Sequence, residues 1–391
     1  MPPQNNLHEV AIIGAGPAGT TLALALLQAG LKPVILDKAG FPRNKICAGG
    51  LTIKALPFLP REIDAILEDE IFRVNLSFNL DRGFTKAYSQ PLLRTVDRRR
   101  FDAFLVERVQ AAGGEFRQGE RVERLTEIPG GAWSIETSGG SLRAWVVVGA
   151  DGARSVAAQA AGLQPVDFWH LGLQAEVPRK LIRTAAFDRT IWLDLGSMAD
   201  GYAWGFPRGD LLLVGVGGPL SRGRELKRYQ VRALSYLGLD IRSFRLAAHL
   251  IPHRVTPRPL CRNRLLLVGD AAGLADFWTG EGIFSALKSA ALAARQILRF
   301  YQGDLTALLD YQSLMDREIA PELTSAYQFS KIFNYLGPLV FRCLERYDYP
   351  WEVFCRVMRG DRSLLEIKKR FRPDIFFRKL LVKSARNRPI A

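Results

Sequence analysis

The stretch that decides the fold is VAIIGAGPAGTTLALALLQAGLKPVILD, which runs from Val10 to Asp37. An apolar segment is followed by glycines at Gly14, Gly16 and Gly19, a helical pattern, a second apolar segment and an acid. Glycines at this spacing allow a tight turn, a close approach of the backbone to a diphosphate, and close packing of the next helix. The acid lies where ribose hydroxyls are bound. The stretch therefore predicts a dinucleotide site at a helix N-terminus rather than an ordinary glycine turn.

Length and composition indicate a globular protein with more than one structural unit. The chain has 391 residues, of which 48% are hydrophobic and 24% are charged, as expected for a globular chain. Its four cysteines have no metal-binding or disulfide-framework spacing, so we expect no metal site and a reducing, cytoplasmic environment. The polar start predicts no secretory signal, and no apolar run reaches 18 residues, which argues against a membrane span.

The formal charge of +15 requires an anionic partner or a solvated basic segment. Residues 361–391 hold ten Lys and Arg against three Asp and Glu, interleaved with aromatic residues such as Phe376 and Phe377. This mixture is typical of a peripheral contact with an anionic membrane surface. A nucleic-acid partner fits less well because the chain has no nucleic-acid fold signature. The alternative is a solvated basic tail whose aromatic residues pack on the body.

The remaining patterns predict one nucleotide-binding domain interrupted by inserted material. Beta-like runs between Leu171 and Ile251 predict a largely antiparallel sheet that forms one wall of a pocket. The apolar run from Leu265 to Val268 predicts a strand buried on both faces. Beyond Asp304 the pattern is mostly helical. We therefore assign 1–56, 95–165 and 259–300 to the nucleotide-binding domain, 57–94 and 166–258 to the inserted sheet domain, and 301–391 to a helical, basic C-terminal region.

Two further loops narrow the dinucleotide to one cofactor. They are GADGARS, which begins at Gly149, and GDAAG, which begins at Gly269. With the first glycine run they resemble the flavoprotein hydroxylase superfamily, which implies an α/β fold: a Rossmann-like FAD-binding domain with an inserted antiparallel-sheet substrate domain and a helical C-terminal region. The resemblance implies that Asp270 binds the ribityl chain and that Arg98 contacts the flavin. It also implies that Asp151 takes part in FAD and NAD(P)H handling.

Within that superfamily the chain is most similar to the geranylgeranyl reductase family. The segments that carry the similarity are KICAGG from Lys45, TVDRRRFD from Thr95, GYAWGFP from Gly201, and TGEGI ending at Ile283. The family implies FAD-dependent reduction of isolated double bonds in prenyl chains. The expected FAD-binding residues are Gly14, Gly16, Pro17, Ala18, Gly19, Asp37, Lys38, Lys45, Cys47, Ala48, Arg98, Asp151, Gly269, Asp270, Gly280, Gly282 and Ile283.

The chemistry of an unactivated alkene points to particular side chains. Reduced flavin supplies a hydride, and a proton that builds tertiary cation character must lead or accompany it. Aromatic faces stabilise such a cation, so Tyr202 and Trp204 are candidate catalytic residues unless they are ordinary core. A thiol is protonated at neutral pH, which makes Cys47 a candidate proton source or flavin modulator, the alternative being a small apolar residue. The expected prenyl pocket contains Tyr202, Trp204, Phe206, Pro207, Phe277 and Trp278.

Other activities on the same scaffold stay open at the level of sequence. An FAD-dependent monooxygenase is the first alternative because fold does not fix chemistry, and a non-catalytic flavin carrier or redox sensor is the second. Asp276-Phe277-Trp278 stands where relatives often have Asn-Pro, so the pocket rim differs from the family pattern. No second glycine fingerprint indicates an NAD(P)H domain, which leaves NADPH or ferredoxin as the expected electron donor. The sequence gives no indication of an oligomeric state.

Overall fold

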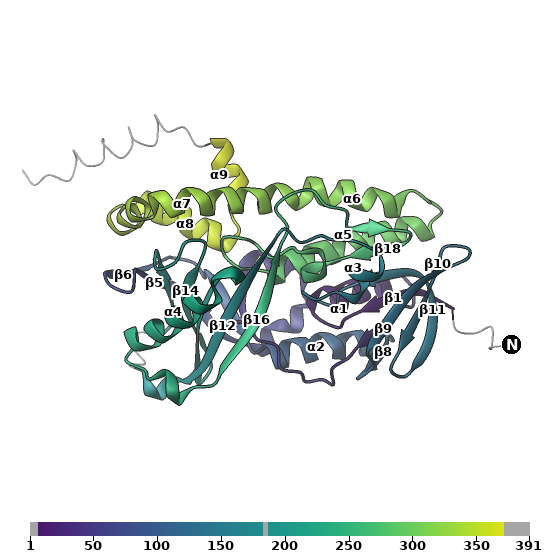
Figure 1. Ribbon diagram of the computed structural model, residues 1–391, viewed down its shortest axis with the longest axis horizontal. Helices are drawn as coiled ribbons and strands as arrows, with labels where there is room; N and C mark the ends of the chain where they lie inside the picture. Colours follow the sequence, from purple (N-terminus) through teal and green to yellow (C-terminus); the bar gives the residue numbers. More distant parts are fainter. Residues whose placement is uncertain (1–6, 183–186, 371–391) are drawn as a thin grey trace, which may run out of the picture.

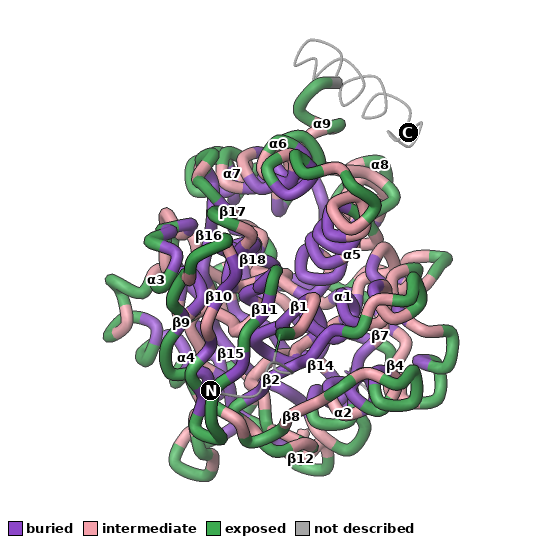
Figure 2. The backbone as a smooth tube through the Cα atoms, turned by 90° about the vertical axis from the view of Figure 1, so that its right-hand side faces the viewer, coloured by how far each residue is buried: buried purple, intermediate pink, exposed green. Residues whose placement is uncertain are grey.

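The computed structural model describes residues 7–182 and 187–370. Two large sheets lie side by side, and the C-terminal helices α6, α7 and α8 run along one side of both (Figure 1). Buried residues are concentrated in the strands β1 and β11 and in the helices α1 and α5 that cover them (Figure 2). The nucleotide-binding half of the molecule therefore contains the largest continuous core.

The first sheet is built around the strand that precedes the glycine run. Val10, Ala11 and Ile12 have no exposed surface, because β1 pairs in parallel with β11 on one side and β2 on the other. Such burial on both faces explains its uninterrupted apolar sequence. The strands are, in spatial order, β17 (Cys261–Arg262), β18 (Leu265–Leu267), β11 (Gly140–Gly149), β1 (Leu7–Ile13), β2 (Val34–Asp37) and β8 (Glu115–Gln118), with β10 (Ala132–Thr137) on β11 and β9 (Val122–Ile128) on β10.

The second sheet is the largely antiparallel sheet that the sequence predicts. Its order is β16 (Leu246–His253), β12 (Phe168–Pro178), β15 (Leu211–Pro219), β14 (Tyr202–Arg208), β13 (Thr190–Leu195), β5 (Arg73–Phe78) and β6 (Gly83–Ala87). One pairing differs from the rest: β5 runs parallel to β13 and joins an early segment of the chain to a late one. A small third sheet has the order β3 (Gly50–Thr52), β7 (Leu93–Val96) and β4 (Leu67–Ile71).

Three helices begin at residues that are favourable at a helix N-terminus. Asp97 caps α2 by accepting a hydrogen bond from the backbone N–H of Arg99, and Ser155 caps α3 in the same way through Ala158. Pro17 is the first residue of α1, where its missing N–H is harmless. The helices are α1 (Pro17–Gln28), α2 (Arg98–Ala111), α3 (Val156–Ala160), α4 (Gly223–Tyr236), α5 (Ile283–Tyr301), α6 (Ala307–Glu318), α7 (Ala320–Arg346), α8 (Asp348–Arg359) and α9 (Leu364–Arg370).

The C-terminal helices are tied to the body by a buried cation. The Arg254 side chain follows β16 and is only 1% exposed. Its Nη2 lies 2.7 Å from Oδ1 of Asp316 on α6 and also donates to the carbonyl oxygen of Arg258. Among the residues that the structure describes, Asp316 is the carboxylate that balances this charge. Removing that carboxylate therefore leaves a buried charge uncompensated.

We expect Asp316→Ala to lower the free energy of unfolding by about 2 to 3 kcal/mol, below the full cost of breaking a buried pair because the Asp316 side chain is 32% exposed. The matched control is Asp310→Ala on the same helix. Asp310 pairs with Arg299 and is 49% exposed, so its loss should cost less than about 1 kcal/mol. Urea denaturation of the three proteins measures both values, and equal losses in the two variants would contradict the assignment.

Candidate active site

One cavity of about 2550 Å³ opens between the two large sheets and the C-terminal helices. It is lined by every residue that the sequence assigns to FAD except Gly19. Pockets for a single small ligand usually measure about 300 to 1000 Å³. The cavity is therefore large enough for a dinucleotide and a second ligand together.

In the glycine loop, backbone segments approach so closely that a side chain at Gly14 or Gly19 would collide with a carbonyl oxygen. Gly14 has a φ of +105°, and a Cβ atom there would lie 2.3 Å from the carbonyl oxygen of Ala150. A Cβ atom at Gly19 would lie 1.9 Å from the carbonyl oxygen of Gly14. Gly19 thus lies beneath the loop and lets α1 pack against β1, which explains why it does not line the cavity.

Asp37 holds the loop from the next strand. Its Oδ2 accepts a hydrogen bond of 2.8 Å from the backbone N–H of Ala15, and the side chain is buried. Across the loop, Nη2 of Arg43 lies 3.2 Å from the position of a Cβ atom on Gly16, and Nε of Arg43 is buried without a hydrogen-bond partner in the described residues. An open glycine cradle, a helix N-terminus and a guanidinium together fit the diphosphate of FAD.

Two arginines share one buried carboxylate beside the cysteine loop. Arg98 binds Asp102 through two hydrogen bonds of 2.9 and 3.0 Å, and Arg43 reaches the same carboxylate at 3.0 Å. Burial alone would lower the pKa of Arg98, but the charge of Asp102 raises it above its usual value. The thiol of Cys47 also contributes to the raised pKa of Arg98. The sulfur of Cys47 accepts a hydrogen bond of 3.3 Å from the backbone N–H of Gly49.

A second polar cluster joins the cysteine loop to the Gly-Asp loop. Nζ of Lys45 lies 2.6 Å from Nε2 of His249 on β16, and that nitrogen lies 4.0 Å from Oδ2 of Asp270. Burial works to raise the pKa of Asp270, but the hydrogen bond with His249 and the charge of Lys45 hold it below its usual value. His249 and Arg43 were missed at the level of sequence, because neither belongs to a motif and only the fold brings them to the cavity.

Asp151 has a structural task in addition to lining the cavity. Its carboxylate accepts hydrogen bonds from the hydroxyl of Ser155 at 2.6 Å and from the backbone N–H groups of Val156 and Ala157 at 2.6 and 3.3 Å. It therefore caps α3, and burial raises its pKa. These internal donors mean that the side chain shapes the loop, whatever it contributes to the cofactor.

The aromatic strand β14 presents one face to the cavity. The indole of Trp204 lies over glycines of the neighbouring strand β15, since a Cβ atom at Gly215 would come within 2.3 Å of it and one at Gly217 within 3.2 Å. Nε1 of Trp204 is buried without a partner in the described residues. The glycines thus leave room for the indole to pack against the sheet, and Trp204 also lines the cavity.

Tyr202 and Phe206, on the same strand as Trp204, contact two other segments that line the cavity. The Tyr202 hydroxyl donates to the carbonyl oxygen of Thr279, and a Cβ atom at Gly50 would lie 2.9 Å from the Phe206 ring. The expectation that Pro207 lines the pocket is wrong: it is buried but absent from the cavity wall. Successive residues of a strand face opposite sides, so Pro207 points away from the face of Tyr202, Trp204 and Phe206.

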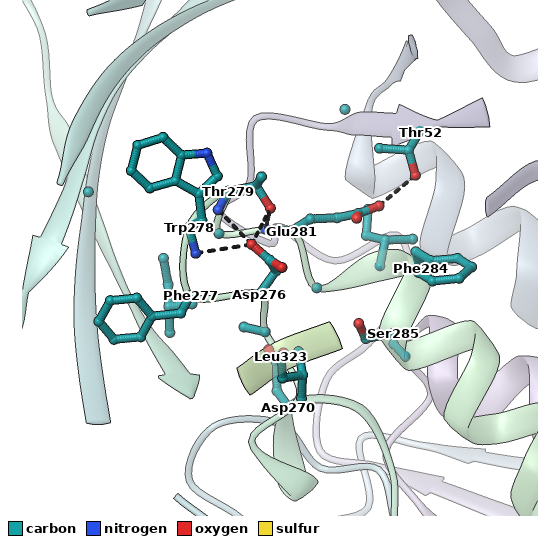
Figure 3. Close-up of a pocket in the computed structure, with 18 of the residues that line it drawn as sticks. Thr52, Asp270, Asp276, Phe277, Trp278, Thr279, Glu281, Phe284, Ser285 and Leu323 are labelled. Carbon is teal, nitrogen blue, oxygen red and sulfur yellow. Dashed lines mark hydrogen bonds between the residues drawn. The ribbon is translucent and has the colours of Figure 1, made fainter. Parts of the chain in front are cut away.

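The rim at Asp276 is a folded turn. Oδ1 of Asp276 accepts hydrogen bonds from the backbone N–H groups of Trp278 and Thr279 and from the Thr279 hydroxyl (Figure 3). Phe277 and Trp278 both line the cavity. Trp278 packs on Phe333 of α7 with ring centroids 4.6 Å apart. The bulky pair therefore joins the turn to the C-terminal helices.

Glu281 precedes α5 and joins its loop to the segment after the cysteine loop. Its carboxylate accepts a hydrogen bond of 2.5 Å from the Thr52 hydroxyl (Figure 3). The same carboxylate forms an ion pair of 2.8 Å with Nζ of Lys54. Gly282 is the residue that precedes α5. The Thr-Gly-Glu-Gly loop is therefore held to the strand that follows the cysteine loop, and the two loops meet at the cavity.

The C-terminal helices supply an apolar wall that sequence reasoning missed. The signal was present as aromatic and aliphatic residues at helical spacing, but nothing in it distinguished a cavity wall from ordinary core. The residues of this wall are Phe329, Phe333, Leu336, Val340, Phe354, Val357 and Met358. Phe333, Val340, Phe354 and Met358 belong to one hydrophobic cluster with Ile191, Leu193 and Leu195 of the second sheet, and these three also line the cavity. The lining therefore combines polar loops with a large apolar part.

A pair of buried histidines lies beside the cavity, which His170 lines. The rings of His170 and His253 are 4.4 Å apart, and Phe277 packs against both. Burial lowers the pKa of His253 to about 4. Burial and the neighbouring His253 lower the pKa of His170 to about 3. Both rings are therefore neutral at pH 7.

This pair should make the protein less stable in acid. Between pH 6.5 and about 4 the unfolded chain binds protons at both histidines and the folded chain does not, so the free energy of unfolding falls as the pH falls, by up to about 1.4 kcal/mol per pH unit for each ring. We expect His170→Phe to reduce this slope. Thermal unfolding measured from pH 7 to pH 4 tests it, and equal slopes in both proteins would contradict the assignment.

Comparison with known proteins agrees with this geometry. A family model described as an FAD binding domain matches residues 8–177. Digeranylgeranylglycerophospholipid reductase 1 of Methanopyrus kandleri is 31% identical over 327 residues, which covers 79% of this chain and 85% of the relative. Two solved structures at 19% identity share the fold. A geranylgeranyl bacteriochlorophyll reductase-like protein of Thermoplasma acidophilum has a TM-score of 0.76 and covers 93% of this chain and 99% of its own. A probable FAD-dependent monooxygenase of Pseudomonas aeruginosa has a TM-score of 0.66 and covers 84% and 97%. The chain belongs to the geranylgeranyl reductase family of FAD-dependent oxidoreductases.

Proposed function

We propose that this protein saturates isolated carbon-carbon double bonds of a geranylgeranyl-type prenyl chain. The observation that carries the proposal is one large cavity whose lining combines the glycine loop and Cys47 with an extensive apolar wall. A prenyl chain requires such a wall along its length, because its hydrocarbon surface gains free energy by leaving water. The family relationship supports the same substrate class.

The proton is the part of the reaction that this chain must supply. FAD, once bound and reduced, supplies a hydride to one alkene carbon. We assign the proton for the other carbon to the thiol of Cys47, because this side chain lines the cavity. The interaction with Cys47 contributes to the raised pKa of Arg98, so the guanidinium lies within electrostatic range of the sulfur that gives up the proton. Solvent then returns the proton to Cys47.

The aromatic rings of Tyr202 and Trp204 can stabilise the positive charge that protonation of the alkene creates. Tyr202 and Trp204 have ring centroids 5.6 Å apart and both line the cavity. Aromatic faces attract a cation, more strongly where water is excluded. The glycines of β15 leave room for the indole of Trp204, and we assign these two rings the stabilisation of tertiary cation character.

The source of the reducing equivalents belongs to the proposal as well. We propose NADPH or a ferredoxin as the electron donor for FAD. We also propose a peripheral contact with an anionic membrane through the basic region 361–391. Most of that region, 371–391, lies outside the described residues.

The activity is tested by incubating the reduced holoprotein with geranylgeranyl diphosphate under anaerobic conditions, followed by mass spectrometry. We expect the product to gain two hydrogen atoms for each double bond reduced. Incorporation of oxygen under air would instead identify an FAD-dependent monooxygenase. No change in several prenyl substrates would favour a flavin carrier or redox sensor, and either result would overturn the reductase.

The role of Cys47 is tested separately. We expect Cys47→Ala to retain FAD but to lower kcat by about 10²-fold or more, the usual contribution of a positioned acid. Cys261→Ala is the control, because Cys261 on β17 is half-buried and does not line the cavity. Flavin absorbance gives the cofactor content and single-turnover oxidation of the reduced protein gives the rate. Normal turnover in Cys47→Ala would remove the thiol from the mechanism.

A further inference from the structure

An apolar stripe covers the outer face of α7. Ile332, Tyr335, Leu336 and Leu339 are 54%, 84%, 47% and 45% exposed. Their spacing of three and four residues places them on one face of the helix. Single exposed apolar residues need no explanation, but a contiguous group on one element marks a surface that contacts something else.

The stripe is continuous with the cavity. Ile332, Leu336 and Leu339 line the cavity as well as being exposed. On the same helix Phe333 and Val340 lie further inside it. The stripe therefore forms part of the cavity's mouth, and an apolar chain that enters over α7 keeps hydrocarbon contact from the surface to the interior.

The stripe ends in two arginines on the same face. Arg342 and Arg346 follow Leu339 at spacings of three and seven residues, both are exposed, and neither forms an ion pair within the described ranges. By contrast, Glu345 on the adjoining face is occupied by Arg82. An apolar stripe flanked by unpaired cations is the pattern of a helix that lies in the headgroup layer of an anionic bilayer.

We infer that the α7 surface formed by Ile332, Tyr335, Leu336, Leu339, Arg342 and Arg346 docks on an anionic lipid bilayer, from which the prenyl substrate enters the cavity. This inference rests on the proposed function and names the source of its substrate. No described helix is both long and apolar enough to cross a bilayer, so the contact is interfacial. Tyr335, the most exposed member of the stripe, has the amphipathic ring that suits that depth.

The charge of the patch decides between a bilayer and a second copy of the chain. A second copy that packed through the same patch would bring its own Arg342 and Arg346 to the contact, where like charges repel. A bilayer that contains phosphatidylglycerol offers the opposite charge and an apolar interior together. Each basic residue near such a surface strengthens the contact several-fold.

The test compares two variants of the full holoprotein that carry the same change in charge. The first is Tyr335→Glu/Arg342→Gln/Arg346→Gln, and none of its three positions lines the cavity. The second is Val231→Glu/Arg228→Gln/Arg232→Gln on α4, where one apolar residue and two arginines are exposed away from the cavity. Co-sedimentation with phosphatidylglycerol–phosphatidylcholine vesicles should fall at least about tenfold in the first variant and stay within about twofold of wild type in the second.

Turnover separates this inference from the proposed function. In the first variant we expect the KM for a prenyl lipid embedded in vesicles to rise, with kcat unchanged and with normal turnover of water-dispersed geranylgeranyl diphosphate. Equal vesicle binding by wild type and the first variant would overturn the docking surface while leaving the reductase intact. A wild-type dimer that the first variant dissociates, without vesicle binding, would also overturn it. Absence of any prenyl reduction by wild type would overturn the function, while vesicle binding would still be measured.

Discussion

The close approach of Gly14 to the carbonyl oxygen of Ala150 determines where a cofactor can lie. A Cβ atom at Gly14 would come within 2.3 Å of that oxygen, so the loop after β1 and the loop after β11 are in backbone contact. Strand β18 pairs with β11 in parallel and brings the Gly269-Asp270 loop alongside. Three loops therefore meet at the carboxyl ends of neighbouring parallel strands, which is where open α/β sheets bind their ligands. The cysteine loop and the second sheet complete the enclosure.

The cavity that results is lined by both charged and apolar side chains, and the candidate catalytic residues line it as well. Asp102 balances Arg98 and Arg43, which keeps positive charge beside the glycine loop without leaving it uncompensated. The apolar part of the lining is built by β14 and the C-terminal helices. The cysteine loop leads into β3, and Gly50 at the start of β3 packs against the Phe206 ring of β14, so Cys47 precedes a segment that contacts the aromatic strand. A hydrocarbon chain and a flavin can thus share one cavity without burying unpaired charge.

Short sequence patterns predicted those elements whose structure depends on neighbouring residues in the chain. The glycine run fixed β1, α1 and β2, and the alternation on β14 identified the face that carries Tyr202, Trp204 and Phe206. The same alternation, applied strictly, would have excluded Pro207. Long-range contacts could not be predicted: the parallel pairing of β5 with β13, the approach of His249 to Lys45 and the wall formed by α7 depend on how distant segments pack. The roles of individual site residues stay predictions until they are tested on the protein.

The central claim is that one cavity holds the prenyl chain between β14 and α7, beside the flavin. Photoaffinity labelling of the holoprotein with a geranylgeranyl diphosphate analogue that carries a diazirine at the far end of its chain tests this claim most directly. Labelled peptides should come from β14 (Tyr202–Arg208), α7 (Ala320–Arg346) and α8 (Asp348–Arg359), and unmodified substrate should compete for the labelling. Competed labelling confined to segments that do not line the cavity, such as α4 (Gly223–Tyr236), would contradict it.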